Sequence, residues 1–125
     1  MSARAPLSEF RHAVKLFNRG DFFAAHEVWE DVWRAAPPSE KKFLQGLIQV
    51  SVAFHHHSTG NLVGARSLLD RGFGNLESCS QNKSGARDQG NVRLRALLDQ
   101  LTGWRRAFAE GGSLPPLPRI EWIGR

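Results

Sequence analysis

A short pattern occurs twice in the sequence, and its second copy begins forty residues after the first. The first copy reads Gly20-Asp21-Phe22-x-x-Ala25 and the second reads Gly60-Asn61-Leu62-x-x-Ala65. In each copy a glycine can end one helix in a left-handed conformation, and the Asp or Asn after it can cap the next helix. The repeat therefore predicts two helical hairpins of similar build. Tetratricopeptide-like units are built from helical hairpins of this kind, although two copies are too few for a solenoid.

Apolar residues recur at helical spacing through most of the chain. We expect helices over residues 7–19, 21–36, 39–59, 61–78 and 92–109. The third is apolar almost all round from Phe43 to Phe54, which is typical of a helix at the centre of a bundle. The fourth should turn five residues inward: Leu62, Ala65, Leu69, Phe73 and Leu76. The pattern predicts an all-α fold, a compact bundle of about five helices built from two αα-hairpins plus a closing helix and an extended C-terminal tail.

The whole chain, residues 1–125, fits a single helical domain of 14.0 kDa. Within it we expect a flexible N-terminus over residues 1–6, a polar loop over 79–90 and an extended tail over 111–125. The tail contains Leu114-Pro115-Pro116-Leu117-Pro118, which favours a polyproline conformation. The apolar Ile120 and Trp122 that follow favour packing of the tail on the bundle over binding to a partner domain.

Composition restricts the classes of partner. No segment approaches the roughly 20 apolar residues that span a bilayer, so we expect no membrane insertion. The single Cys79 cannot form an intrachain disulfide, which suits a cytoplasmic protein. The net charge of +5 is compatible with nucleic-acid binding. However, the basic residues are scattered along the sequence, and aromatic residues do not alternate with them. A solvated basic face is therefore the preferred interpretation. A homo-oligomer is compatible with the sequence.

A polar pair interrupts the apolar face of the second expected helix. Steps of four and three residues place His26, Glu30 and Trp33 on one stripe, with His26 and Glu30 roughly 5–6 Å apart at Cβ. Imidazole and carboxylate ligands suit a divalent transition metal such as zinc, iron, nickel or manganese. We expect His26, Glu30 and His56 to be the metal ligands, with Glu27, Trp33, Gln45 and Gln49 as pocket or supporting residues.

Two other interpretations compete with the metal site. The polar residues of the second and third helices could form a buried hydrogen-bond network that fixes helix register. The hairpins would then serve as a helical protein-interaction module, with an unknown protein or small molecule as partner.

The motif from His26 to Glu30 does not match the Glu-x-x-His pattern of ferritin-like sites or the His-Glu-x-x-His pattern of zinc proteases. The sequence therefore predicts no reaction class and no catalytic residue.

Four ordered blocks resemble a known family: Phe17-Asn18-x-Gly20-x-Phe22-x-x-Ala25-His26-Glu27, Trp33-Arg34, Phe43-Leu44-Gln45-Gly46-Leu47-Ile48-Gln49 and Gly60-Asn61-x-x-Gly64-Ala65. They are similar to the domain of unknown function 309 family of bacterial and archaeal proteins. The resemblance runs from about Phe10 to Gly72. The family signature, His-x-x-x-Glu-x-x followed by Trp or Tyr, corresponds here to His26, Glu30 and Trp33. The resemblance implies an all-helical fold, a prokaryotic source and a suggested metal site, and it implies no activity.

Overall fold

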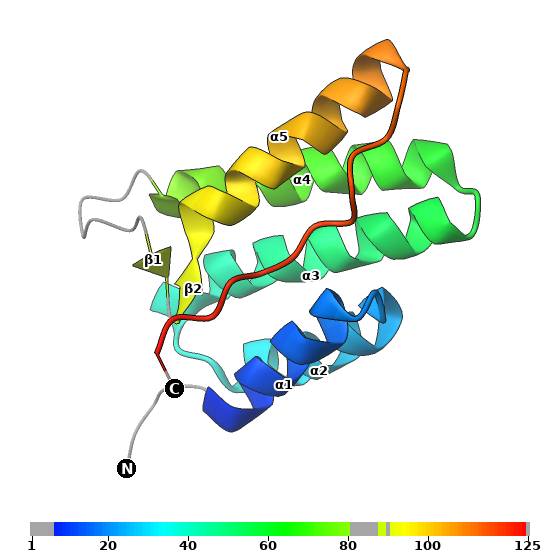
Figure 1. Ribbon diagram of the computed structural model, residues 1–125. Coiled ribbons are helices and arrows are strands. Elements are labelled where there is room, and N and C mark those ends of the chain that lie inside the picture. Colours follow the sequence, from blue (N-terminus) through cyan, green and yellow to red (C-terminus); the bar gives the residue numbers. More distant parts are fainter. Residues whose placement is uncertain (1–6, 81–87, 90, 125) are drawn as a thin grey trace.

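The computed structural model describes residues 7–80, 88–89 and 91–124. Five helices form a compact all-α bundle, as predicted (Figure 1): α1 (Leu7–Asn18), α2 (Phe22–Ala35), α3 (Pro38–Ser58), α4 (Leu62–Ser80) and α5 (Leu94–Glu110). Two strands of two residues each, β1 (Asp88–Gln89) and β2 (Val92–Arg93), pair antiparallel before α5. The expected flexible segment 1–6 lies outside the described residues, as do residues 81–87 and 90 of the expected loop.

The two copies of the sequence repeat fold in the same way. Gly20 and Gly60 adopt left-handed φ values of 84° and 86° between the paired helices. Ala25 and Ala65 are fully buried where the hairpins close. The Asn61 side chain caps α4 by accepting a hydrogen bond from the Gly64 amide at 3.0 Å. Thus α1 with α2, and α3 with α4, are two versions of one helical hairpin.

The side chain of Asp21 does not make the expected cap. Asp21 occupies the N-cap position of α2, but its backbone at φ −89° and ψ 68° lies outside the extended region and its side chain makes no capping hydrogen bond. Side-chain caps ordinarily need an extended N-cap residue, which orients the carboxylate toward the free amides. The same local sequence pattern therefore gives a capped helix in one hairpin and a helix without a side-chain cap in the other.

Helix α3 occupies the centre of the bundle, between α2 and α4 (Figure 1). Its buried residues form much of the core: Phe43, Leu44, Gly46, Leu47, Val50, Ser51, Ala53 and Phe54. The buried Ser51 satisfies its hydroxyl by donating to the Leu47 carbonyl at 2.9 Å. Helix α5 then packs mainly on α4. The central position predicted for this helix is confirmed.

Three details differ from the sequence-based expectations. Leu62 is 59% exposed, because it is the first residue of α4 and lies before the helix reaches the core. Helix α4 continues to Ser80, so the first part of the expected loop is helical. The last part contains β1 of the small antiparallel pair. Short alternating segments of this kind carry too little periodicity to be recognised in sequence.

The C-terminal tail runs back along the bundle from the end of α5 toward α1 (Figure 1). Trp104 Nε1 donates to the Pro116 carbonyl at 2.8 Å. The Asn18 side chain bonds the backbone of Ile120 on both sides, accepting from its amide at 2.7 Å and donating to its carbonyl at 2.9 Å. Ile120 is 2% exposed. Within the residues that the structure describes, none of the helices is long and apolar enough to cross a membrane.

Candidate functional site

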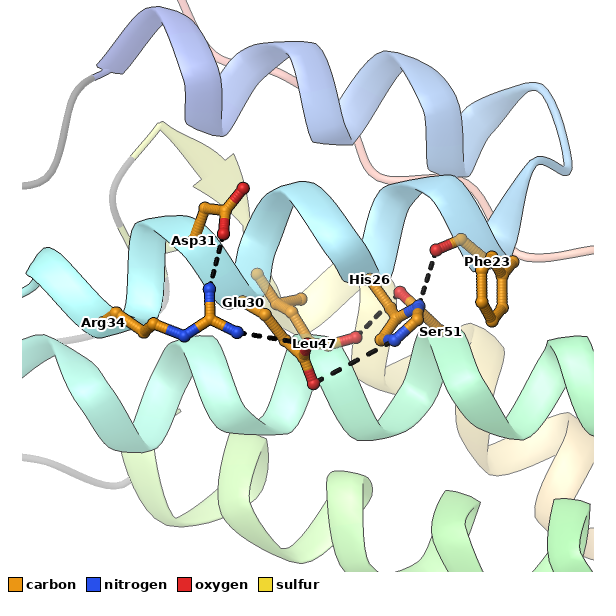
Figure 2. Close-up of polar contacts among 7 residues, drawn as sticks. All are labelled: Phe23, His26, Glu30, Asp31, Arg34, Leu47 and Ser51. Atoms are coloured by element: carbon orange, nitrogen blue, oxygen red, sulfur yellow. Dashed lines mark hydrogen bonds and ion pairs between the residues drawn. The ribbon is translucent and has the colours of Figure 1, made fainter.

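The His26 and Glu30 side chains extend from α2 toward α3 and converge (Figure 2). His26 Nε2 lies 4.0 Å from Glu30 Oε2, and the two side chains are 14% and 45% exposed. Their spacing of four residues on one helix brings them together, as the sequence predicts. The pair therefore lies at the mouth of the groove between α2 and α3, with the imidazole more buried than the carboxylate.

The orientation of the His26 ring is set by its other nitrogen. Nδ1 lies 2.5 Å from the Phe23 carbonyl oxygen one turn earlier in α2 (Figure 2). A carbonyl oxygen can only accept, so Nδ1 must carry the hydrogen. In the neutral ring Nε2 is then an unprotonated lone-pair donor directed at a carboxylate. This is the arrangement by which a backbone carbonyl orients a metal-binding histidine and fixes its tautomer.

Glu30 also borders a pocket of about 230 Å³. The pocket is lined by Glu30, Trp33, Arg34, Gln45 and Ile48. Arg34 Nη2 lies 3.9 Å from Glu30 Oε1, while its Nη1 bonds Asp31 more closely. The Asp31 carboxylate lies on the opposite side of the arginine from Glu30 (Figure 2). The carboxylate of Glu30 therefore has one loose cationic neighbour, Arg34, and the His26 imidazole at 4.0 Å, and it has no close ion pair among the described residues.

Trp33 forms the aromatic wall of this pocket. It is partly buried against the core, and Lys41 of α3 places its Nζ 4.0 Å from the centroid of the indole ring. This distance is typical of a cation–π contact. Trp33 Nε1 is buried and has no hydrogen-bond partner among the described residues. The wall is thus held between the core and a lysine of the neighbouring helix.

The remaining predicted site residues do not join the pair. His56 lies next to Asn61, whose Nδ2 is 3.3 Å from His56 Nδ1, and Gln49 Oε1 accepts from Asn75 Nδ2 at 2.7 Å. Glu27 is on the exposed side of α2, one residue and about 100° from His26. Among the described residues no three His, Cys, Asp or Glu side chains converge as a metal-binding group.

The expectation that His56 shares a site with His26 and Glu30 is therefore not met in this arrangement. The reason is rotational: consecutive residues on α3 point about 100° apart around the helix axis, so they turn to different neighbours. His55 contacts Phe23 of α2, with ring centroids 5.0 Å apart, while His56 faces the start of α4. Gln49, one member of the alternative hydrogen-bond network with His26, Glu30 and Gln45, is instead bonded to Asn75 on α4.

The second hairpin provides an internal comparison for the site. By the repeat register, Glu30 corresponds to Asp70 and Trp33 corresponds to Phe73. Arg105 of α5 bonds Asp70 at 3.0 Å and stacks 4.2 Å from the Phe73 centroid. Lys41 covers Trp33 similarly, but Glu30 receives no comparable ion pair. Glu30 in the first hairpin therefore lacks a close ion pair, whereas its counterpart Asp70 in the second hairpin has one with Arg105.

Comparison with known proteins supports the family resemblance. Residues 10–68 match the model of a family described as Domain of unknown function (DUF309). This segment belongs to the DUF309 family. The resemblance drawn from the ordered motif blocks is thereby confirmed, and the segment contains most of α1, all of α2 and α3, and the first part of α4. The DUF309 segment thus includes the His26, Glu30 and Trp33 stripe.

Two relatives extend this comparison. The chain is 31% identical over 95 residues to an uncharacterized protein of Aquifex aeolicus (strain VF5), a match that covers 74% of this chain and 27% of the relative. It is 34% identical over 65 residues to uncharacterized protein YpuF of Bacillus subtilis (strain 168), covering 51% of this chain and 37% of YpuF. The chain thus spans well under half of the length of either bacterial relative. No solved structure matches it.

Sequence reasoning missed several residues around the DUF309 motif. Lys41, Arg34 and Ile48 border the pocket or its aromatic wall, yet none was singled out. Arg34 had a usable signal, because it follows Glu30 by four residues on the same helix. Lys41 and Ile48 belong to α3, so their approach to Trp33 depends on how two helices are rotated, and the sequence of either helix does not specify this.

Proposed function

We propose that this chain binds a divalent transition metal ion through His26 Nε2 and the Glu30 carboxylate. The observation that carries the proposal is the 2.5 Å contact of His26 Nδ1 with the Phe23 carbonyl oxygen. This contact places the hydrogen on Nδ1, so in the neutral ring the Nε2 lone pair faces the Glu30 carboxylate, 4.0 Å away. Bonds of about 2.0–2.2 Å at a tetrahedral angle place two donors about 3.4 Å apart. A small rotation of the half-exposed Glu30 side chain would bring both donors onto one cation.

The site would supply two protein ligands, fewer than the three that hold a typical catalytic zinc ion. Water or an exogenous ligand would complete the coordination, and the pocket beside Glu30 offers space for such a ligand. A cation held this way acts as a Lewis acid on a bound oxygen when present. In this proposal His26 and Glu30 bind, the Phe23 carbonyl orients the imidazole, and Trp33 closes one side of the pocket.

Calorimetric titration of protein without an affinity tag, with zinc, manganese and nickel, tests the proposal. We expect a stoichiometric site that is lost in both His26→Ala and Glu30→Gln. Glu27→Gln is the matched control, because it removes a carboxylate from the exposed side of the same helix and should leave binding unchanged. His56→Ala should also retain the site. Binding should weaken on acidification, because protons compete for Nε2.

Circular dichroism separates loss of ligands from loss of fold. Both substituted side chains border the α2–α3 groove and neither is fully buried, so each variant should keep the helical spectrum and cooperative unfolding of the original chain. Absence of metal binding, or binding that survives both substitutions, would contradict the proposal. Either result would favour the interaction-module interpretation, in which the pair only contributes to the shape of the α2–α3 groove.

A further inference from the structure

Arg34 lies between two carboxylates of α2 and bonds one of them far more closely than the other (Figure 2). Its Nη1 donates to Asp31 Oδ1 at 2.5 Å, whereas its Nη2 lies 3.9 Å from Glu30 Oε1. Asp31 precedes the arginine by three residues and Glu30 precedes it by four, so helical spacing allows either ion pair. In the structure the guanidinium is held at Asp31, on the side away from the Glu30 carboxylate.

The position of this guanidinium bears on the proposed metal site, because an arginine and a divalent cation compete for the same carboxylate. A close pair between Arg34 and Glu30 would use both carboxylate oxygens if it were bidentate. It would also place a positive charge beside the cation, and like charges a few ångströms apart repel each other. With Arg34 at 3.9 Å from Oε1, the other oxygen of Glu30 stays directed at His26 Nε2.

The second hairpin shows the same carboxylate position with a different neighbour. In the forty-residue register Glu30 corresponds to Asp70, which has a close ion pair with Arg105 of α5 at 3.0 Å. Asp31 corresponds to Arg71, so the second copy has a basic residue where the first has an acidic one. The carboxylate with a close arginine is therefore the one that is not followed by an aspartate.

We propose that Asp31 is a positioning residue for the metal site: it holds Arg34 away from Glu30 and so keeps the Glu30 carboxylate available to the cation. The inference rests on the proposed function, and it gives a role to a residue that the metal itself would not contact. Asp31 acts only through Arg34, since the two carboxylates lie on opposite sides of the guanidinium (Figure 2). The Asp31 and Arg34 side chains are both largely exposed, so substitution of either should leave the fold intact.

Calorimetric titration with zinc chloride tests the proposal through a cycle of substitutions. Asp31→Asn keeps the size of the side chain but removes the charge that holds the arginine. It should weaken zinc binding by about two- to fivefold, the range that competition from an exposed ion pair covers. Addition of Arg34→Ala to this variant should restore at least the original affinity, because the competing guanidinium is then gone.

Glu27→Gln is the matched control for loss of one negative charge on α2. It lies on the exposed side of the helix and should leave the dissociation constant for zinc unchanged. In a chain that already carries Arg34→Ala, Asp31→Asn should have no larger effect than this control. Circular dichroism checks that each variant keeps the helical spectrum.

A measurement without metal separates this inference from the proposed function. The Nε–H resonance of Arg34 in proton–nitrogen NMR spectra reports on the carboxylate that the guanidinium contacts. Glu30→Gln should leave this resonance nearly unchanged in the original chain. The same substitution should shift it in Asp31→Asn, where the arginine is free to pair with Glu30.

Three results would overturn the role of Asp31. The first is unchanged zinc affinity in Asp31→Asn, and the second is an equal weakening when Arg34 is already alanine, which would show an effect of net charge alone. The third is an Arg34 resonance that does not respond to Glu30→Gln in Asp31→Asn. Absence of zinc binding in the original chain would instead contradict the proposed function, and the NMR comparison would still decide whether Asp31 holds the arginine.

Discussion

Trp29 is a large, fully buried side chain whose indole nitrogen has no hydrogen-bond partner among the described residues. Its ring packs 5.9 Å from both Phe10 and Phe17. A buried donor without a partner costs about 1–3 kcal/mol, whereas truncation of a buried aromatic costs about 3–5 kcal/mol. The packing of this residue therefore contributes more to stability than its unmet polar group removes.

This balance gives a prediction for two substitutions at Trp29. Trp29→Phe removes the unsatisfied N–H together with part of the ring, so the two effects oppose each other and stability should change by less than about 1.5 kcal/mol. Trp29→Ala should lower the free energy of unfolding by about 3–5 kcal/mol. Urea denaturation followed by circular dichroism measures both. Similar losses in the two variants would show that the indole nitrogen is satisfied in solution.

Cys79 gives a prediction about reactivity. Burial raises the pKa of the Cys79 thiol, and the positive charge of Lys42 opposes part of this shift. Lys42→Ala should therefore raise the pKa further and slow alkylation by iodoacetamide at a given pH, because the thiolate is the reactive form. Lys41→Ala removes an equal charge that lies over Trp33, and should leave the rate unchanged.

The same pKa shift has a consequence for stability. A thiol whose pKa is raised by folding binds its proton more tightly in the native state. Its contribution to stability is therefore complete below the pKa of the unfolded chain and is lost as the pH rises through the higher native value. Cys79→Ala should consequently lose less stability on alkaline titration than the original chain. Equal alkaline losses in both would show that the thiol titrates alike in the two states.

At the scale of the elements, the contact between α3 and α4 depends on two glycines. A Cβ at Gly72 would lie 2.9 Å from the Gly46 carbonyl oxygen and 3.0 Å from the Val50 amide nitrogen. A Cβ at Gly46 would lie 2.8 Å from two atoms of the Leu76 side chain. Backbone atoms of a packed helix cannot retreat without moving the helix, whereas a leucine side chain can adjust.

We therefore predict a graded effect of alanine substitution. Gly72→Ala should destabilise the bundle by about 1–3 kcal/mol, and Gly46→Ala should cost less. Gly74 is the control on the same helix, since no atom lies within 4 Å of its added Cβ. Gly74→Ala should stabilise the chain by up to about 1 kcal/mol through helix propensity. Thermal unfolding of the three variants should therefore rank them Gly74→Ala, Gly46→Ala, Gly72→Ala, from most to least stable.

Elements with strong local signals were predictable from the sequence. The Gly-Asp and Gly-Asn turns and the apolar stripes located five helices, because each signal acts within a few residues. The His26 and Glu30 pair was predictable for the same reason, since both side chains belong to one helix. The assignment of His56 depended on the rotation of α3 relative to α2, which is set by the packing of many side chains.

At the scale of the whole molecule, the most distant contacts were the least predictable. Arg11 of α1 contacts the ring of Trp122, and the two residues are brought together only when the tail crosses the bundle. The polyproline segment predicted an extended chain, and the apolar residues after it predicted packing on the bundle. Neither feature specified that Asn18 would hold Ile120. The register of the tail is fixed by that pair of side-chain hydrogen bonds, and only the folded α1–α2 hairpin presents them.

The tail gives a final prediction, because two of its aliphatic residues differ sharply in burial. Ile120 is 2% exposed and Leu117 is 52% exposed. Ile120→Ala should lower the free energy of unfolding by about 2–5 kcal/mol, as expected for truncation in a core. Leu117→Ala should change it by less than about 0.5 kcal/mol, as expected at the surface. Release of the tail should also speed tryptic cleavage after Arg119, whose side chain bonds the Asn18 carbonyl at 3.2 Å. Equal cleavage rates in the two variants would mean that the tail is anchored mainly through Trp104 and Pro116.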